Sequence, residues 1–295
     1  MSYYKLLNLK KEPFSTSPDP SFFYRSLAHN TAIQRLEIAI RLRRGLSLIL
    51  GDVGTGKTTL SRALLRSFAQ EEDFIFYMIL DPTYNSEFQF LSTLVKMMGV
   101  KPLFRSTLDY KEALEKFLFK AGVEENKTII LLIDEGQKLG PAFLEILRTL
   151  LNYETNDYKL LQVVIMAQME LLPRIRKMKN FLDRVSLKYI VNPLDERETR
   201  ELIQFRLHQA GLNSERTIFS EEAVKLIYSY TQGYPRRIAA LCHKALESIV
   251  MKECYLVDRD IVRALIEEEV SEEISYGEEY FSRGKTLASY SGRPA

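Results

Sequence analysis

One octapeptide has the residue types and the spacing that bind a polyphosphate. Residues 51–58 read GDVGTGKT, which matches the pattern G-x-x-x-x-G-K-[ST]. The mostly apolar run 46–50 precedes it and a helical pattern follows from Thr58, which is the context that this pattern requires. Glycines let successive backbone N–H groups turn toward phosphate oxygens, and the N-terminus of the next helix adds positive potential. The sequence therefore predicts a phosphate-binding loop, with ATP as its ligand.

Each residue of this loop has an expected role. Lys57 is expected to contact the β- and γ-phosphates, and the hydroxyl of Thr58 is expected to bind Mg²⁺. The residues that we expect to hold the nucleotide are Gly51, Asp52, Val53, Gly54, Thr55, Gly56, Lys57, Thr58 and Thr59.

A pair of carboxylates, Asp134 and Glu135, follows the apolar run 128–133. Open parallel sheets bind their ligands at the carboxyl ends of strands. We expect Asp134 to hold Mg²⁺ through water and Glu135 to act as the base that orients the attacking water. Alone, such a pair is usually a solvated strand end. Together with the phosphate loop it predicts hydrolysis by water, because mononucleotide kinases share the loop and need no such pair.

Two further residues are candidates for sensing the γ-phosphate. Gln168 follows the apolar run 160–166, and its amide is suited to hydrogen-bond both the γ-phosphate and the attacking water; a polar strand cap is the alternative. Arg236 lies in the first turn of a predicted helix, where the helix dipole disfavours a cation. We therefore expect an anion nearby, and Arg236 is expected to reach the nucleotide from a second domain.

Arg184 is the candidate arginine finger, a side chain that acts on the ATP of a neighbouring subunit. Arg174 and Arg176 are alternatives, and an ordinary surface arginine is an equally good reading of Arg184. A finger requires a neighbour, so the chain is expected to self-associate as a ring or a filament.

Two basic clusters are candidates for contact with a nucleic-acid backbone. They are Lys177 with Lys179, and Arg41 with Arg43 and Arg44. Cations favoured at the C-terminus of a helix explain the second cluster equally well.

The composition is that of a water-soluble globular chain. Its 295 residues are 46% hydrophobic and 27% charged, and the formal net charge is +2. Glutamates concentrate near the C-terminus, so the rest of the chain is mildly basic, which leaves DNA open as a partner without requiring it. The sequence has no apolar run of signal-peptide or membrane-span length, so a cytoplasmic location is expected. Cys242 and Cys254 have neither disulfide nor zinc spacing.

The apolar runs alternate with helical patterns over the first two thirds of the chain. The runs are 46–50, 74–80, 128–133, 160–166 and 186–191, and the helical patterns are 58–70, 86–98, 108–121, 141–153 and 170–177. This alternation predicts an α/β fold with a parallel sheet covered on both faces, a P-loop NTPase core.

Only helical patterns follow Pro193, which predicts a small C-terminal all-helical lid domain. The expected helices are 196–210, 220–230, 236–251 and 259–268. The expected organisation is an N-terminal arm and helix packed on the core (1–45), a P-loop ATPase core (46–193), a helical lid (194–268) and a flexible acidic tail (269–295).

With these motifs the chain resembles the ATPase module of the general secretion pathway protein A (ExeA-type) family of AAA+ proteins. The resemblance covers Tyr3 to about Ile266. Its segments are Phe14, Pro18-Asp19-Pro20, 29–36, 51–59, Leu147-Arg148, 152–155, 168–171, Arg206-Leu207, Ala210-Gly211 and 233–238. It implies an oligomeric ATPase that acts with secretion or export components in assembling a type II secretion apparatus.

The chain departs from this family in three respects. It has neither the membrane span nor the peptidoglycan-binding domain of some members. Ala167 stands where the family tends to have glycine, and Asp183 precedes Arg184 where a glutamine is usual. The module is also similar to transposition ATPases of the MuB and TnsC type, which form ATP-dependent filaments on DNA, and a signalling ATPase is a third hypothesis.

Overall fold

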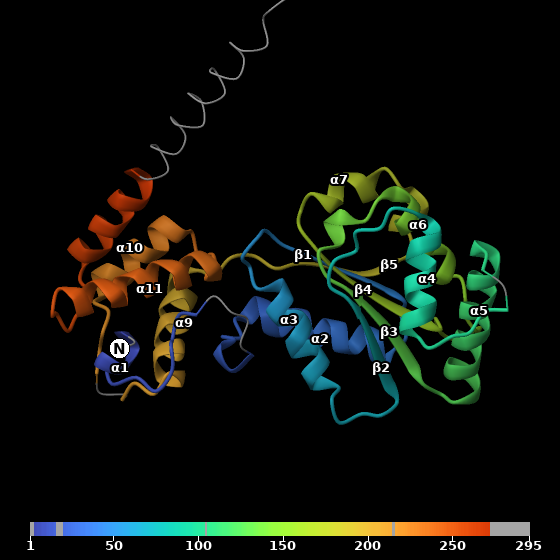
Figure 1. Cartoon of the computed structure of the whole chain (residues 1–295), viewed down its shortest axis with the longest axis horizontal. Helices are drawn as coiled ribbons and strands as arrows, with labels where there is room; N and C mark the ends of the chain where they lie inside the picture. The colour runs from blue at the N-terminus through green and yellow to red at the C-terminus, as the bar shows by residue number, and fades with distance from the viewer. Residues whose placement is uncertain (1–2, 16–19, 104, 214–215, 272–295) are drawn as a thin grey trace, which may run out of the picture. The chain divides into compact units, whose positions relative to one another are not determined.

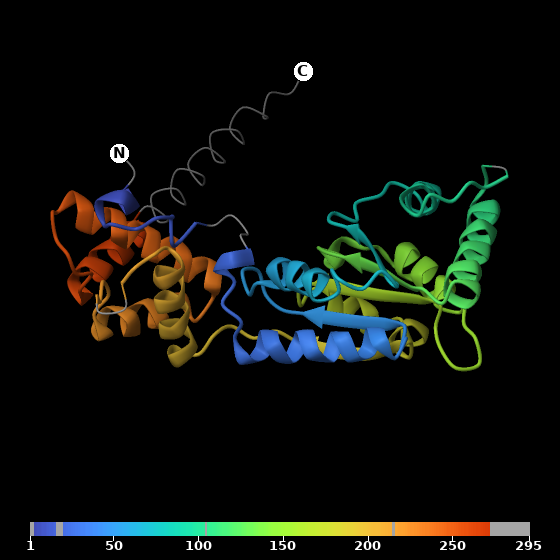
Figure 2. The ribbon, with the colours of Figure 1, turned by 90° about the horizontal axis from the view of Figure 1, so that it is seen from below.

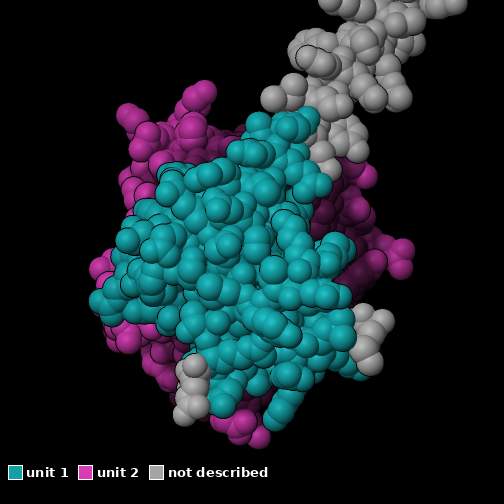
Figure 3. Space-filling view, turned by 90° about the vertical axis from the view of Figure 1, so that its left-hand side faces the viewer, with its two compact units in different colours: residues 1–17, 193–295 teal, residues 18–192 magenta. Residues whose placement is uncertain are grey.

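The structure, a computed structural model, describes residues 3–15, 20–103, 105–213 and 216–271. The chain divides into two compact units, residues 18–192 and residues 1–17 with 193–295 (Figure 3). Most of the expected tail, residues 272–295, lies outside the described residues, whereas 269–271 continue a helix that begins at residue 259.

The larger unit is built on a five-stranded parallel sheet in the order β2-β3-β4-β1-β5 (Figure 1). Its strands are β1 (Leu46–Leu50), β2 (Phe74–Ile79), β3 (Thr128–Ile133), β4 (Leu161–Ala167) and β5 (Val185–Ile190). Every residue of the three inner strands is buried, because helices cover both faces of the sheet. Exposure alternates along the edge strand β5. The predicted fold class is confirmed.

Two layers of helices cover the sheet (Figure 2). On one face, α2 (Leu27–Arg41) and α3 (Lys57–Ser67) pack on Ile130 and Leu132 of β3. On the other face, Ile129 and Leu131 of β3 belong to the core formed with α4 (Glu87–Met97), α5 (Thr107–Phe119) and α6 (Pro141–Leu150). The short elements of this unit are η1 (Pro20–Phe22), the π-turn η2 (Lys120–Glu124), η3 (Gly136–Lys138), α7 (Leu171–Arg176) and α8 (Lys179–Leu182).

The smaller unit is helical. Its elements are α1 (Tyr3–Leu6), α9 (Glu196–Gln209), α10 (Glu221–Thr231), α11 (Pro235–Met251) and the helix over 259–271. Asp195 and Glu198 form a reciprocal capping box at the start of α9. Gly233, at φ +73°, is required before α11, because an added Cβ would overlap the backbone of Leu194.

The N-terminal arm corrects one expectation. Residues 1–45 were expected on the core, but the first 17 residues belong to the unit of the C-terminal helices. Phe14 is 1% exposed and packs edge-on against Phe219, with 6.0 Å between ring centroids. The backbone N–H of Lys10 donates to the carbonyl of Ala210 at 2.7 Å. Burying an aromatic ring and pairing the backbone fix the arm on this unit.

One basic cluster is also used internally. Arg41 forms a two-point ion pair with Glu71, with N–O distances of 2.8 and 2.7 Å. Arg43 donates to Thr128, Gly122 and Asn126, and its guanidinium lies 4.4 Å from the centre of the Tyr158 ring. These contacts give both arginines structural roles, which removes the main support for that cluster as a nucleic-acid contact.

The two cysteines should differ sharply in reactivity. Cys242 is buried in α11, and burial raises the pKa of its thiol far above the usual value, whereas Cys254 is exposed. Because the thiolate is the reactive form, we expect only Cys254 of the native chain to react rapidly with Ellman's reagent, and both cysteines to react in denaturant. Cys254→Ser should abolish the rapid phase. Rapid labelling of the native Cys254→Ser variant would contradict the packing of the smaller unit.

Candidate nucleotide site

The residues predicted to bind and hydrolyse the nucleotide lie at one edge of the sheet because β3, β4 and β1 are parallel neighbours. Leu50 is paired in register with Ala167, and the backbone N–H of Gly51 donates to the carbonyl of Ala167 at 3.2 Å. Ile133, at the end of β3, is paired with Ile165 of β4. The segments that follow these three strands therefore begin side by side.

The loop after β1 has the backbone of a phosphate cradle. Gly54 and Gly56 have φ angles of +83° and +93°, which side chains rarely adopt. Gly51 has no room for a side chain, since an added Cβ would lie 2.8 Å from the Thr55 hydroxyl and from the Val191 carbonyl oxygen. Helix α3 begins at Lys57, and the first N–H groups of a helix lack partners within it. A loop of this backbone conformation is suited to direct its N–H donors toward a bound phosphate.

Lys57 joins this loop to the two carboxylates. Its ammonium group is 2.8 Å from the carbonyl oxygens of both Gly51 and Asp52. Burial lowers the pKa of Lys57, and the negative charges of Glu135 and Asp134 oppose this shift. Lys57 therefore lies close enough to Asp134 and Glu135 to be attracted by their charges.

Asp134 and Thr58 fit the expected Mg²⁺ site in their chemistry. Asp134 is only 3% exposed, and its Oδ1 accepts the backbone N–H of Glu135 at 2.9 Å. Thr58 is in the first turn of α3, directly after Lys57. A buried carboxylate and a hydroxyl are hard oxygen donors, and Mg²⁺ typically takes few ligands from protein and the rest from phosphate and water.

The predicted γ-phosphate sensor meets the loop of the predicted base. Gln168 follows β4, and its backbone N–H donates to Oε1 of Gln137 at 3.0 Å. Nε2 of the same Gln137 side chain donates to Oε2 of Glu135 at 2.6 Å. Gln168 and Glu135 therefore lie on either side of one glutamine side chain, which the sequence analysis did not select.

The four candidate arginines lie in four different environments. Arg184 directly precedes β5, and Val185 is paired with Leu46, so Arg184 lies at the amino edge of the sheet, opposite the phosphate loop. Arg174 is engaged inside the unit by hydrogen bonds to the carbonyl oxygens of Gln137 and Leu139. Arg176 is exposed, and Arg236 is exposed in the first turn of α11 in the smaller unit.

His29 contacts the phosphate loop, a role that the sequence did not predict. This histidine of α2 is 2% exposed, and its Nε2 lies 2.9 Å from the carbonyl oxygen of Thr55 in the phosphate loop. A carbonyl oxygen only accepts, so Nε2 carries the proton. Nδ1 lies 2.7 Å from Oγ of Ser26, and the Phe23 ring packs edge-on against the imidazole. His29 thus restrains the phosphate loop through the Thr55 carbonyl. In the sequence, His29 stood out only as the first residue of segment 29–36 of the family resemblance.

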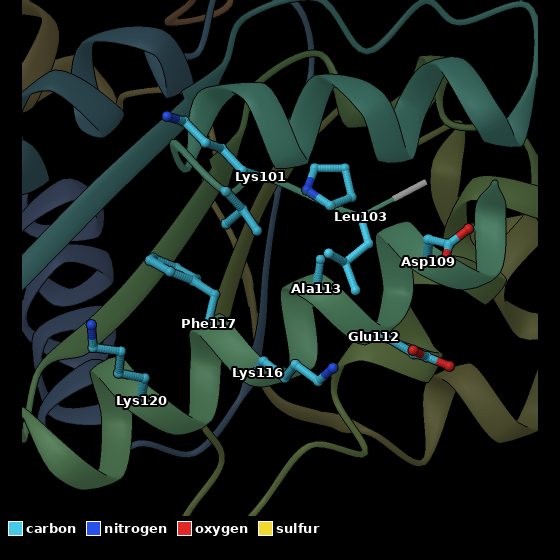
Figure 4. Close-up of a pocket in the computed structure, with 10 residues that line it drawn as sticks. Lys101, Leu103, Asp109, Glu112, Ala113, Lys116, Phe117 and Lys120 are labelled. Atoms are coloured by element: carbon cyan, nitrogen blue, oxygen red, sulfur yellow. The ribbon is translucent and has the colours of Figure 1, made fainter. Parts of the chain in front are cut away.

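A separate hollow of about 280 Å³ lies on α5 and the segment before it (Figure 4). Three lysines line it, Lys101, Lys116 and Lys120, together with Asp109 and Glu112. None of the residues expected to hold the nucleotide contributes to its lining.

Comparison with known proteins agrees with this geometry. A family model described as an AAA domain matches residues 40–175. The chain is 33% identical over 255 residues to general secretion pathway protein A of Aeromonas hydrophila, an alignment that covers 83% of this chain and 44% of that protein. The chain thus spans less than half the length of this relative.

Solved structures show the same fold at low sequence identity. The ORC2 protein of Aeropyrum pernix, in ADPNP–ADP complexes, superposes with a TM-score of 0.62 at 17% identity, over 88% of this chain and 72% of that chain. Drosophila ORC bound to DNA gives a TM-score of 0.65 at 21% identity, over 91% and 66%. The RuvB Holliday junction branch migration motor of Thermotoga maritima gives 0.55 at 15% identity, over 84% and 72%.

The sheet, the phosphate loop and the paired carboxylates define a P-loop NTPase module of the AAA+ class. Within that class the chain is related to general secretion pathway protein A, as an ATPase module. In the parts of the chain that the structure describes, no helix combines the length and the apolarity needed to cross a membrane.

The contact of His29 with the phosphate loop predicts a binding defect. His29→Ala leaves the Thr55 carbonyl without its donor, and an unsatisfied buried group costs about 1–3 kcal/mol, so affinity for ATP should fall by roughly tenfold or more. Titration with a fluorescent ATP analogue measures this. His208→Ala, at an exposed histidine of the smaller unit, is the control. Unchanged affinity in a folded His29→Ala variant would remove His29 from the site.

Proposed function

We propose that this chain hydrolyses ATP with water as the acceptor and works as an oligomer that drives or regulates assembly of a secretion or export apparatus. The observation that carries the proposal is the register of β1, β4 and β3, which starts the segments of Lys57 and of Asp134 and Glu135 at one edge of the sheet, inside a single compact unit. A phosphate loop beside two carboxylates is the arrangement that phosphoryl transfer to water requires.

In this proposal the phosphate chain of ATP lies in the cradle of residues 51–59. Backbone N–H groups of the loop and of the first turn of α3 donate to the phosphate oxygens. Lys57 exchanges its contacts with Gly51 and Asp52 for the β- and γ-phosphates. His29 keeps the loop in shape through Thr55.

Thr58 and Asp134 would hold Mg²⁺, with Asp134 acting through water. The ion would supply charge neutralisation for the phosphates. Asp134 also accepts the N–H of Glu135, which fixes the start of the loop that carries the base.

Glu135 would accept a proton from the attacking water and orient it. Gln168 would hydrogen-bond the γ-phosphate and the water from the end of β4. The placement of both residues around Gln137 supports this division of roles.

The position of Arg184 makes its assignment as a finger depend on an oligomer. The five residues of β1 separate the edge with Arg184 from the edge with the phosphate loop, on the order of 15 Å at about 3.3 Å per residue. An arginine side chain does not span that distance. Arg184 can therefore serve only a neighbour's ATP as a finger, in a ring or a filament. Arg236 would approach the nucleotide from the helical lid.

The proposed partners follow from the relative's name. A protein called general secretion pathway protein A is matched over 83% of this chain, so we propose components of a secretion or export apparatus as the partners, with the module acting on the cytoplasmic side where ATP is supplied.

DNA is the second candidate partner. One of the solved structures with this fold is that of an ORC bound to DNA, and the chain carries a formal net charge of +2. With Arg41 and Arg43 engaged internally, the candidates for phosphate contact are the exposed pair Lys177 and Lys179 and, around the hollow on α5, Lys101, Lys116 and Lys120 (Figure 4).

Substitutions of the two central residues should separate binding from chemistry. Lys57→Ala removes contacts made in the ground state, so it should abolish binding of ATP. Glu135→Gln should bind ATP normally and lower kcat by roughly 10² or more, because the base acts only in the transition state. Isothermal titration and phosphate release measure the two effects. Equal loss of binding in both variants would exclude Glu135 as the base.

The proposed finger should be replaceable in a mixed oligomer. Arg184→Ala should bind ATP almost normally and lose about 10³ or more in rate. Mixing it with Lys57→Ala should restore activity, because Arg184 of the Lys57→Ala subunit can serve the intact loop of its neighbour. Arg176→Ala is the matched comparison from the same connection. A mixture that stays inactive although mixed oligomers form, or wild-type turnover by Arg184→Ala, would reject the assignment.

If DNA is a partner, binding should require ATP and weaken steeply with salt, because phosphate contacts release counterions. Changing Lys101, Lys116 and Lys120 together to alanine should lower the slope of log K against log salt by about 2–3. Fluorescence anisotropy with a labelled duplex measures both effects. No binding at low ionic strength, or binding that is insensitive to salt, would retire this candidate.

A further inference from the structure

Gln137 bridges the segments that follow two neighbouring strands. It lies in η3, directly after the Asp134-Glu135 pair, and its side chain is half-buried. Its Oε1 accepts the backbone N–H of Gln168, after β4, at 3.0 Å. Its Nε2 donates to Oε2 of Glu135 at 2.6 Å. One amide thus contacts both the predicted base and the segment that carries the predicted sensor.

The orientation of this amide follows from its partners. A backbone N–H can only donate, so the atom that faces Gln168 must be the oxygen of the Gln137 amide. The NH₂ group then necessarily faces Glu135, whose carboxylate oxygen accepts. The end of β4 therefore determines which end of the Gln137 amide faces the carboxylate of Glu135.

The backbone of Glu135 needs restraint. Its φ and ψ are +52° and +34°, the left-handed region that side chains seldom occupy. Such a conformation persists only where the surroundings determine it. Gly136 supplies one constraint, because it is pressed against β4 so closely that an added Cβ would overlap the side chain of Ile165. The hydrogen bonds of Glu135 to Asp134 and Gln137 supply the others.

A second contact ties the same loop to the connection between β4 and β5. Arg174 of α7 donates to the carbonyl oxygen of Gln137 at 2.8 Å, and also to that of Leu139. This connection runs from Gln168, at the nucleotide edge, to Arg184 at the opposite edge. Side-chain and backbone contacts of Gln137 therefore both join the base to the connection that carries the proposed finger.

We propose that Gln137 is a positioning residue that sets the carboxylate of Glu135 and couples it to the β4–β5 connection. This inference rests on the proposed ATPase function. Movement of the connection, as a neighbouring subunit engages Arg184, is transmitted to Glu135 through the Gln137 amide. The base is thereby aligned by the state of the subunit interface.

The test is steady-state hydrolysis by Gln137→Ala and by the isosteric Gln137→Glu. Both should keep KM and ATP affinity within about twofold of wild type and lower kcat by roughly tenfold to hundredfold, the range for loss of a hydrogen bond to a charged group. Gln137→Glu should be at least as slow as Gln137→Ala, because it keeps the shape and the acceptor for Gln168 but places a negative charge against Glu135. Turnover at the wild-type rate, or faster, in either variant overturns the proposal.

Gln162 is the matched control. This buried glutamine bridges the opposite end of the sheet, accepting from the Gly45 N–H at 2.7 Å and donating to the Lys159 carbonyl at 2.8 Å. Gln162→Ala should lower the melting temperature and leave kcat close to wild type. If Gln162→Ala lowers kcat as much as Gln137→Ala does, the effect is a general loss of stability and the proposal fails.

A double-mutant cycle separates positioning from a structural role. If Gln137 acts through Glu135, Gln137→Ala should have no further effect on the residual rate of Glu135→Gln. Additive losses overturn the proposal. Absence of phosphate release from the wild-type chain overturns the ATPase function and this inference together, whereas an active wild type with an equally active Gln137→Ala overturns only the inference.

Discussion

The parallel pairing of β3, β4 and β1 is the constraint on which the rest of the site depends. Because these strands are neighbours and run in one direction, the segments that follow them start together at one edge. The phosphate loop, the carboxylate pair and Gln168 come from segments that are far apart in the sequence. Interactions between sequence neighbours therefore cannot bring them together. Burial of all three strands under helices restricts their register, since a slip would move apolar side chains out of the packing that buries them.

The same pairing gives the opposite edge a different role. Arg184 precedes β5, so the direction of the strands that brings Lys57 to its ligand carries Arg184 away from it. The connection between β4 and β5 therefore joins the two edges of the sheet, with its start at the nucleotide edge and its end at the edge of the proposed arginine finger. Arg174 and Gln137 attach the start of that connection to the loop of Glu135. The proposed site, assembled from two subunits, rests on this geometry.

The sequence predicted what depends on local pattern. The phosphate loop, the acidic pair and the parallel sheet follow from short motifs and apolar runs, and the run 128–133 coincides with β3. Contacts between distant segments were not predictable in this way. A buried histidine and an amide bridge, His29 and Gln137, have no period or spacing that identifies their partners. The sequence likewise did not predict the surface on which Phe14 of the N-terminal arm is buried.

The central claim is that water attacks the γ-phosphate in a site made by Lys57, Asp134 and Glu135. The most direct measurement is mass spectrometry of the phosphate released from ATP and Mg²⁺ in water labelled with oxygen-18. The account predicts one labelled oxygen in each released phosphate, together with unlabelled ADP. Labelled ADP, phosphate without label, or transfer of the γ-phosphate to another acceptor would contradict it.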